Sequence, residues 1–343
     1  MTEQRFETGE TPHVIISECQ GGVVVKSWRQ TAVSIQGDNF TAGQDGDIRV
    51  SGQSSLYLAV PENASLSLGR VHGDLTIKHV AGGITIDEVF GSVALTNLDA
   101  VHLKNARQAV TADNLNGRLV VEQAGGDVAL ISVSGVQLGA VAGQVIIRFV
   151  NGRLDLGEIG GRLELASVNG DVALANGRAD VVLQNLGGVN TLPVVAGDVW
   201  LVGGLRSGAH HIASAQTVYV YWPEDAPVRL SAAAPIVESR LPLSRQAEAT
   251  KEGLTTLTGD IEEGEAWLTL QAAQRVALIP VGPEPPRFSP DEFVFAPEPA
   301  AELALRVQTA VHAVLAEFPE MDGLEEQLVT AVVAALQDDK VTR

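Results

Sequence analysis

Four carboxylates occupy one recurring position of this chain and could supply acid–base chemistry or bind a cation. Asp74, Asp127, Asp171 and Asp198 each follow a glycine. Stacked carboxylates repel one another, which raises the pKa of one of them or recruits a cation. However, the separation of Asp127 from Asp171 is not a whole number of turns of about 18 residues. We therefore interpret these residues as solvated turn aspartates, without the acid and base that a glycoside hydrolase needs.

The histidines and the single cysteine do not form a recognisable catalytic or metal site either. His210 and His211 are adjacent, and adjacent side chains on a strand point to opposite faces, so the two cannot easily bind one metal. We expect them to lie in a loop. Solvent-facing strand positions account for His72, His79 and His102. Cys19 has no second cysteine to pair with, so we expect it to be a small buried residue.

Known catalytic motifs are absent from the sequence. It contains no nucleophile elbow, phosphate-binding loop or zinc-binding helix motif. Paired glycines such as Gly160 and Gly161 recur with the period of the strands, so we interpret them as corners rather than as a phosphate cradle. The sequence predicts no catalytic residue, no bound metal and no cofactor, and we do not expect an enzyme.

Charge and composition exclude several classes of partner. Of 343 residues, 42 are Asp or Glu and 23 are Lys or Arg, for a net charge of −19. Nucleic acids and anionic membranes attract basic proteins, so neither is an expected partner. Hydrophobic residues make up 45%, which indicates a folded chain, and with 4% aromatics the core must be aliphatic. Because the sequence has neither a signal peptide nor an apolar run long enough for a membrane span, we expect a cytoplasmic location.

The element that would position any site is a short repeat of a glycine, any residue, an aliphatic residue, any residue and a second aliphatic residue. It runs from Gly73 to Gly197 with an average period of just under nine residues. Alternating apolar residues indicate a short strand with one buried face. A helix is excluded, because glycines at this frequency would each cost about 1 kcal/mol. The glycine is expected at a corner, where a side chain would clash or φ must be positive.

Two arrangements of these strands are compatible with the repeat: a parallel solenoid and an antiparallel meander of hairpins. The spacing of the glycines does not alternate as hairpins require, which favours the solenoid. Asn116, Ser134, Asn151 and Asn169 each precede a glycine, and nearly equal steps of two glycine repeats separate them. Stacked in a solenoid, their side chains could hydrogen-bond from one turn to the next. We therefore predict about 18 residues per turn in preference to about 27.

The flanks differ from the regular repeat, and the predicted class is all-β with a C-terminal α-helical hairpin. We divide the chain into a polar tail at 1–11, a β-solenoid at 12–281, a proline-rich linker at 282–299 and the hairpin at 300–340. Apolar residues at three-to-four spacing predict the hairpin. Its expected partner contacts are Leu303, Val307, Val311, Val314, Phe318, Leu328 and Val332. Two helices this short must pack on the solenoid or on another copy of the chain.

Copies of Gly-Asp-[Val/Leu]-x-aliphatic, such as Gly126-Asp127-Val128, occur beside the related phrases Val60-Pro61-Glu62-Asn63-Ala64 and Trp222-Pro223-Glu224-Asp225-Ala226. This combination resembles the bacterial β-strand-repeat family known as putative adhesins, over roughly residues 12–281. The resemblance implies a right-handed parallel β-helix (solenoid) without known catalytic residues. The helical hairpin and the lack of an export signal depart from that family. A similarity to the polymerising bactofilins fits less well, because their turns have three short faces.

These observations favour a non-catalytic scaffold that self-associates, or binds another protein, through its C-terminal helices or the ends of the solenoid. The alternative is a carbohydrate-binding or adhesin-like module. Its candidate contacts are Tyr219 and Tyr221, which both face out if Val218 and Val220 face in. Covering the end of the solenoid is the simpler role for these aromatic residues. A carbohydrate-active enzyme is the weakest hypothesis, because no acid–base pair can be named.

Overall fold

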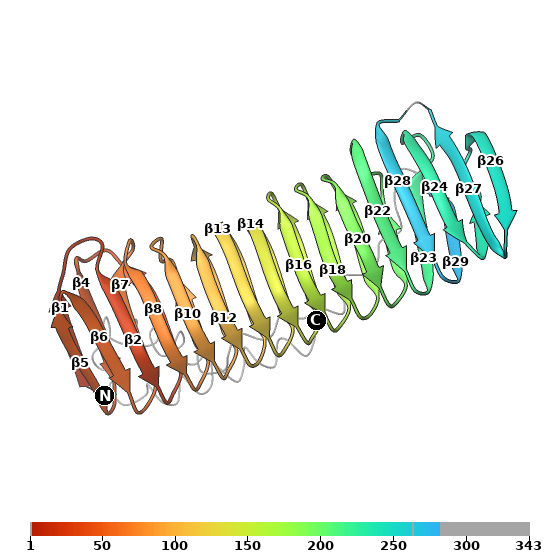
Figure 1. Cartoon of the computed structure of the whole chain (residues 1–343). Helices are drawn as coiled ribbons and strands as arrows, with labels where there is room; N and C mark the ends of the chain where they lie inside the picture. Colours follow the sequence, from red (N-terminus) through yellow and green to blue (C-terminus); the bar gives the residue numbers. More distant parts are fainter. Residues whose placement is uncertain (1, 263, 282–343) are drawn as a thin grey trace, which may run out of the picture. The chain divides into compact units, whose positions relative to one another are not determined.

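The computed structural model describes residues 2–262 and 264–281, and within them the chain folds into β-strands and their connections without a helix (Figure 1). Hydrogen bonds join 29 strands into one mixed sheet. The all-β class is therefore confirmed for this part of the chain. The predicted linker at 282–299 and helical hairpin at 300–340 lie outside the described residues, together with every hairpin contact from Leu303 to Val332.

A regular middle region consists of strands that are separated by short corners. They are β8 (Ser65–Val71), β9 (Leu75–Lys78), β10 (Ile84–Val89), β11 (Val93–Leu98), β12 (Val101–Ala106), β13 (Val110–Ala124), β14 (Val128–Val141), β15 (Val145–Val150), β16 (Leu154–Ile159), β17 (Leu163–Val168), β18 (Val172–Gly177), β19 (Val181–Leu186), β20 (Asn190–Val195), β21 (Val199–Val202), β22 (Gly208–Ser214) and β23 (Thr217–Pro223). The long strands β13 and β14 each continue through a corner and supply two segments.

Strands of the middle region pair in parallel with strands two nine-residue motifs earlier and two later, so the structural repeat comprises about 18 residues. Val93 of β11, for example, lies between Leu75 of β9 and Val110 of β13. From β8 to β19 the step between partners agrees with the predicted period of about 18 residues. Because these pairings are parallel, the alternative of an antiparallel meander is wrong for this region.

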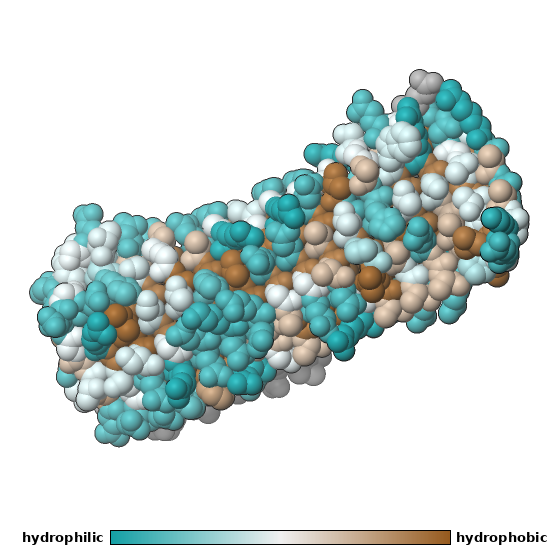
Figure 2. All heavy atoms as spheres, in the orientation of Figure 1, coloured by the Kyte–Doolittle hydropathy of each residue, from teal (hydrophilic) through white to brown (hydrophobic). Residues whose placement is uncertain are grey.

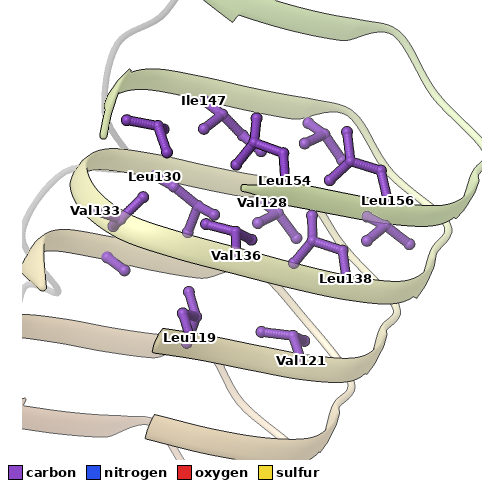
Figure 3. Close-up of a cluster of buried hydrophobic side chains, with 14 of the residues drawn as sticks. Leu119, Val121, Val128, Leu130, Val133, Val136, Leu138, Ile147, Leu154 and Leu156 are labelled. Carbon is purple, nitrogen blue, oxygen red and sulfur yellow. The ribbon is translucent and has the colours of Figure 1, made fainter. Parts of the chain in front are cut away.

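Each segment of the regular region directs three side chains into the core. In β11 these are Val93, Leu95 and Leu98, and none of them is more than 1% exposed. The pairing skips one residue before the third position, which returns Leu98 to the inner side. Figure 3 shows such side chains from neighbouring repeats filling the space between two layers of strands. Burial of each Val, Leu or Ile contributes about 1.5–3 kcal/mol, so the core is a column of aliphatic residues.

The corner glycines stand where the backbones of neighbouring repeats approach closely. A Cβ atom at Gly117 would lie 2.7 Å from the backbone nitrogen of Ala100, and one at Gly126 would lie 2.7 Å from the carbonyl carbon of Gln108. Neither glycine has a positive φ. We expected a corner glycine either because a side chain would clash or because φ must be positive. At Gly117 and Gly126 the first reason is confirmed and the second does not apply.

Left-handed backbone occurs instead at residues with side chains, once in each structural repeat of about 18 residues. These residues are His79, Asn97, Asn114, Ser132, Phe149, Ser167 and Asn185. Asn114 donates from Nδ2 to Oδ1 of Asn97 at 2.5 Å, and the amide of Asn97 lies 3.1 Å from Nδ1 of His79. The predicted asparagine column is confirmed for one pair, because Asn169 donates to Asn151 at 2.9 Å. The left-handed column was not anticipated from the sequence.

Antiparallel strands close the N-terminal end of the sheet. Its strands are β1 (Thr2–Glu7), β2 (His13–Cys19), β3 (Val23–Trp28), β4 (Ala32–Gly37), β5 (Phe40–Asp45), β6 (Asp47–Gly52) and β7 (Leu56–Pro61). The antiparallel pairs are β1 with β4, β4 with β7, and β5 with β6. Within the segment predicted as a polar tail at 1–11, Thr2–Glu7 forms strand β1. The residues of this strand are almost all exposed, so it carries no alternating apolar signal.

The C-terminal end interleaves strands that are distant in sequence. They are β24 (Val228–Ala234), β25 (Ile236–Ser239), β26 (Ser244–Lys251), β27 (Leu254–Ile261), β28 (Ala266–Ala272) and β29 (Arg275–Val281). β28 pairs in parallel with both β22 and β24, and β27 pairs antiparallel with both β24 and β26. The resulting order β22, β28, β24, β27, β26 forms one continuous outer face (Figure 1).

Candidate functional site

The aspartates that follow the corner glycines bind the backbone rather than a ligand. An Oδ1 atom accepts the backbone N–H of the next repeat at 2.8–2.9 Å in four cases: Asp74 from Ser92, Asp127 from Gln144, Asp171 from Val189 and Asp198 from Thr217. Their role is to join neighbouring repeats, which the interpretation as solvated turn residues missed. In the described part of the chain, no group of three or more His, Cys, Asp or Glu side chains is arranged to hold a metal ion.

The cysteine and the first histidines have structural positions. Cys19 is buried, as predicted, and burial raises the pKa of its thiol. His102 is part-exposed on β12, with Nε2 2.7 Å from Glu122. His72 and His79 lie just beyond the ends of β8 and β9 rather than on strands, and the ring of His72 stacks on Phe90.

His210 forms a polar pair inside the otherwise aliphatic core. The expectation that His210 and His211 lie in a loop is wrong, because both belong to β22, and only His211 faces outward. The ring of His210 is 1% exposed and lies against Asn190, which is fully buried. Nε2 donates to the carbonyl of Arg206 at 2.9 Å, so Nδ1 accepts from the backbone and side-chain nitrogens of Asn190 at 3.2 and 3.1 Å.

The environment of His210 favours its neutral form. Burial lowers the pKa of His210, against opposing contributions from the Arg206 carbonyl and Asp171. None of the grooves described below is lined by His210 or by Asn190. We therefore assign the pair to packing.

The aromatic group on β23 lies within the sheet rather than at its end. Val218 and Val220 are buried, so Tyr219 and Tyr221 face outward as expected. β23 pairs with both β21 and β29, so it is not at an edge of the sheet. The expectation that its aromatic residues cover the end is therefore wrong. Tyr219 stacks on Trp200 with ring centroids 5.6 Å apart.

A groove of about 440 Å³ lies on the outer face formed by β24, β26, β27 and β28. Its wall on β28 is Trp267, whose side chain is 55% exposed. The strand explains this orientation: Ala266, Leu268 and Leu270 are buried, so Trp267 and Thr269 must face outward. Figure 2 shows this face of the molecule, with hydrophilic and pale side chains mixed over these strands. A volume of this size suits a small ligand or a few residues of a polymer.

Charged side chains surround the indole of Trp267. The guanidinium of Arg229 lies 5.0 Å from the ring centroid, in cation–π contact. Arg229 is also the antiparallel partner of Asp260 on β27. Neither side chain forms a salt bridge within the described residues, so both retain hydrogen-bonding capacity. Arg245 lines the groove from β26, at a left-handed position with a φ of 48°.

Hydroxyl groups form the floor of the same groove. Thr269 of β28, Ser231 of β24 and Thr258 of β27 are directly opposite one another in the pairing. On each strand, this row lies two residues from the row of Trp267, Arg229 and Asp260. Because successive side chains alternate between the two faces of a sheet, both rows point to solvent. The groove thus combines an aromatic platform, two guanidinium groups, one carboxylate and several hydroxyls.

Two further grooves lack these features. One of about 530 Å³ has Arg107 and Arg178 in its lining, and these form salt bridges with Glu88 and Glu158. The other, of about 510 Å³, contains Arg118 and Arg153, which both contact Asp155. No aromatic residue lines either groove. The Trp267 groove is the stronger candidate, because it alone of the three offers an exposed aromatic ring to a ligand.

Sequence reasoning missed the Trp267 groove, although one signal was available. The alternation in Ala266-Trp267-Leu268-Thr269-Leu270 identifies Trp267 as an outward residue of a half-buried strand. Nothing in the sequence indicates that Arg229, Arg245 and Asp260 would join it, because these residues come from three other strands.

Comparison with known proteins adds little to this site. No family model matches the chain, and no curated protein matches it. One similar solved structure is the crystal structure of a putative cell adhesion protein from Clostridium sporogenes, with 8% sequence identity and a TM-score of 0.14. The match covers 82% of this chain and 97% of that chain. A TM-score this low carries no argument about fold or function. Within the described residues, no helix has the length and hydrophobicity needed to cross a membrane.

Proposed function

We propose that this protein is a non-catalytic carbohydrate-binding module, and that its strands form a right-handed parallel β-solenoid with two segments in each turn. The parallel pairings at a regular step support the solenoid, and the resemblance of the repeat to putative adhesins supports its handedness. The observation that carries the function is the exposed indole of Trp267 beside Arg229 and Asp260 in one groove.

The groove suits a saccharide for three physical reasons. An exposed indole packs against the apolar C–H face of a sugar ring and loses little side-chain entropy on binding. A carboxylate and a guanidinium form charge-assisted hydrogen bonds to sugar hydroxyls, which are stronger than neutral ones. The floor of Ser231, Thr258 and Thr269 supplies further donors and acceptors. A protein partner would fit this surface less well, because protein interfaces usually have an apolar centre.

Binding of the full-length protein to a panel of oligosaccharides, followed by calorimetric titration of the best ligand, tests this function. We expect Trp267→Ala to weaken binding at least about tenfold, or about 1.4 kcal/mol. Tyr219→Ala is the matched control, because Tyr219 is a part-exposed aromatic residue on β23, a strand that does not line the groove. Circular dichroism establishes that both variants are folded. A panel without any ligand, or equal binding by wild type and Trp267→Ala, would overturn the proposal.

Self-association is a second candidate function, favoured by the apolar stripe of the predicted hairpin from Leu303 to Val332. End-to-end contact of the sheet is disfavoured. The edge strand β26 is exposed along its whole length and carries a register irregularity between Ser244 and Ala247, and both features hinder strand addition. Light scattering of the full-length protein and of Val311→Asp/Leu328→Asp tests the helical route. Oligomers that dissociate in the variant support it, and a monomeric wild type removes it.

A further inference from the structure

We propose that the carbohydrate site continues across β28 onto β22, and that it takes a neutral oligosaccharide of at least two sugar units. This inference rests on the proposed carbohydrate-binding function and names the class of ligand. It assigns a second sugar subsite to Ala209 and His211 of β22, neither of which lines the Trp267 groove.

Strand pairing places Trp267 in the middle of this extended site. β28 lies between β24 and β22 in the sheet (Figure 1). Trp267 is opposite Arg229 on β24 and opposite Ala209 on β22. Two residues further along β28, Thr269 is opposite His211. Because residues two apart on a strand share a face of the sheet, the outer face that carries the groove extends past Trp267 onto β22.

The indole of Trp267 offers a ligand the ring face that is turned away from Arg229. The guanidinium of Arg229 lies over the other face, 5.0 Å from the ring centroid. The side chain of Trp267 nevertheless remains 55% exposed, so the face away from Arg229 is open. Ala209, the neighbour on β22, is exposed and ends at a methyl group, which is too short to cover an indole. A sugar ring can therefore pack its apolar C–H face against this side of Trp267.

His211 supplies a polar partner for the same sugar. It is part-exposed and faces outward between the buried residues His210 and Ile212. Within the described part of the chain, the ring of His211 makes no hydrogen bond or ion pair, so both of its nitrogens are available to sugar hydroxyls. Thr269 and Thr191 are its cross-strand neighbours and add a hydroxyl on either side. The second subsite thus combines an apolar wall with a row of polar groups.

The charges of the site favour an uncharged ligand. Three charged residues line the Trp267 groove: Arg229, Arg245 and Asp260. Arg229 and Asp260 are cross-strand neighbours of opposite sign, and Arg245 has an interaction of its own within the protein. The net charge of −19 over the whole chain repels anions. Arg229 beside the stacking surface repels cations, so a neutral sugar is the ligand that meets neither penalty.

The site is long enough for at least two sugar units. β22, β28, β24 and β27 follow one another in the sheet, and neighbouring strands are about 4.8 Å apart. The three strand spacings from Ala209 to Asp260 therefore exceed the length of one sugar ring. One unit would bind Asp260 and the hydroxyl groups of the groove, and the next would pack on Trp267 above Ala209.

Calorimetric titration of the full-length protein with neutral tetrasaccharides of β-linked glucose, mannose and xylose tests the inference. The corresponding monosaccharides, and tetramers that carry a carboxylate or an amine on each ring, are titrated in parallel. The best neutral tetramer is expected to bind at least about tenfold more tightly than its monosaccharide, because only the tetramer occupies both subsites. It is also expected to bind more tightly than either charged tetramer.

Variants of β22 locate the second subsite. Ala209→Leu fills the space beside the indole and should weaken binding of the tetramer at least about tenfold. His211→Ala should also weaken it, and His211→Asn, which keeps a hydrogen-bonding side chain, should restore part of the loss. Ala213→Leu is the matched control, because Ala213 is an outward residue of the same strand that lies opposite Gln271 rather than Trp267. Circular dichroism verifies that each variant is folded.

The outcomes separate the inference from the function on which it rests. If Trp267→Ala weakens binding while Ala209→Leu and His211→Ala do not, the second subsite is overturned and carbohydrate binding stands. Equal affinity for the tetramer and its monosaccharide overturns it in the same way. Tighter binding of a charged tetramer overturns the neutral class. The absence of any ligand among these sugars and the oligosaccharide panel overturns both the inference and the function.

Discussion

The Nδ1 atom of His210 lies 3.1 Å from the side-chain nitrogen of Asn190, and both residues are buried in a column of aliphatic side chains. In the sheet, Asn190 is the partner of Val172 on β18, and His210 is the partner of Leu268 on β28. Asn190 donates to Nδ1 and to the carbonyl of Gly188, while its Oδ1 atom has no hydrogen-bond partner among the described residues. An unsatisfied buried oxygen costs about 1–3 kcal/mol, so this pair is a weak point of the core.

The stability of the protein is expected to fall as the pH drops below about 6.5, the pKa of an unperturbed histidine. Burial lowers the pKa of His210 in the folded state, so the unfolded state binds more protons in the window between the two values. The contribution of His210 is therefore full above the unfolded pKa and is lost as the pH falls towards the folded pKa. Urea denaturation at a series of pH values measures this slope.

The double variant Asn190→Val/His210→Leu is expected to weaken that pH dependence and to be more stable than the single variant His210→Leu. Replacing both members removes the side-chain amide together with its acceptor, whereas the backbone N–H of residue 190 loses the Nδ1 acceptor in both variants. The single variant His210→Leu is the control, because it leaves the amide of Asn190 without its acceptor and should be destabilised. An unchanged slope in the double variant would assign the acid sensitivity to the carboxylates instead.

Gly126→Ala is expected to destabilise the protein by about 1–3 kcal/mol, because the added methyl group meets the backbone of the neighbouring repeat. Gly83→Ala is the matched control. A Cβ at Gly83 meets no atom within 4 Å, so this change should be neutral or slightly stabilising. Thermal or urea unfolding measures the difference. Equal stabilities for the two variants would contradict the close approach of the repeats at the corner.

Phe149→Asn is expected to stabilise the protein by about 1 kcal/mol. Phe149 has a φ of 57° and a 59% exposed side chain, so it strains the backbone and buries little apolar surface. Asparagine tolerates this conformation and occupies it at Asn97 and Asn114 of the same column. Phe149→Ala lacks the short polar side chain with which asparagine hydrogen-bonds locally in this conformation, so it keeps the strain. A gain in unfolding free energy by Asn but not by Ala would attribute the effect to backbone conformation.

Asp198→Ala is expected to cost about 1–3 kcal/mol, because it leaves the backbone N–H of the buried Thr217 without an acceptor. Asp198→Asn retains an oxygen at the same place and should be close to the wild type. If Asn destabilised as strongly as Ala, the negative charge rather than the hydrogen bond would be responsible. Urea denaturation at neutral pH compares the three proteins.

Prediction from the sequence succeeded where each residue interacts with its own repeat or the next one. The inward positions of Val93 and Leu95 follow from alternation alone, and the regular step between paired strands follows from the spacing of the glycines. The same local rule placed Tyr219 and Tyr221 on the outer face. It does not indicate the strand at Thr2–Glu7, where a mostly exposed edge strand carries no apolar signal.

The pairing of Asn190 with His210 could not be predicted, because the regular period is broken between them. Their separation exceeds the regular step, since the connection from β21 to β22 is longer than the usual corner. If the step from Val172 to Asn190 were repeated along the chain, Gly208 rather than His210 would lie beside Asn190. Which residue enters the core at this level therefore depends on the path of residues 203–207.

The sequence by itself determined the class of fold, the period and the aliphatic core, because these depend on alternation and on glycines within a few residues of each strand. Only the tertiary structure decided the Trp267 groove. Its residues come from β24, β26, β27 and β28, and the antiparallel turn of β27 and the insertion of β28 between β22 and β24 bring them together. Strand pairing over such distances is set by the global arrangement of hydrogen bonds, which no local pattern encodes.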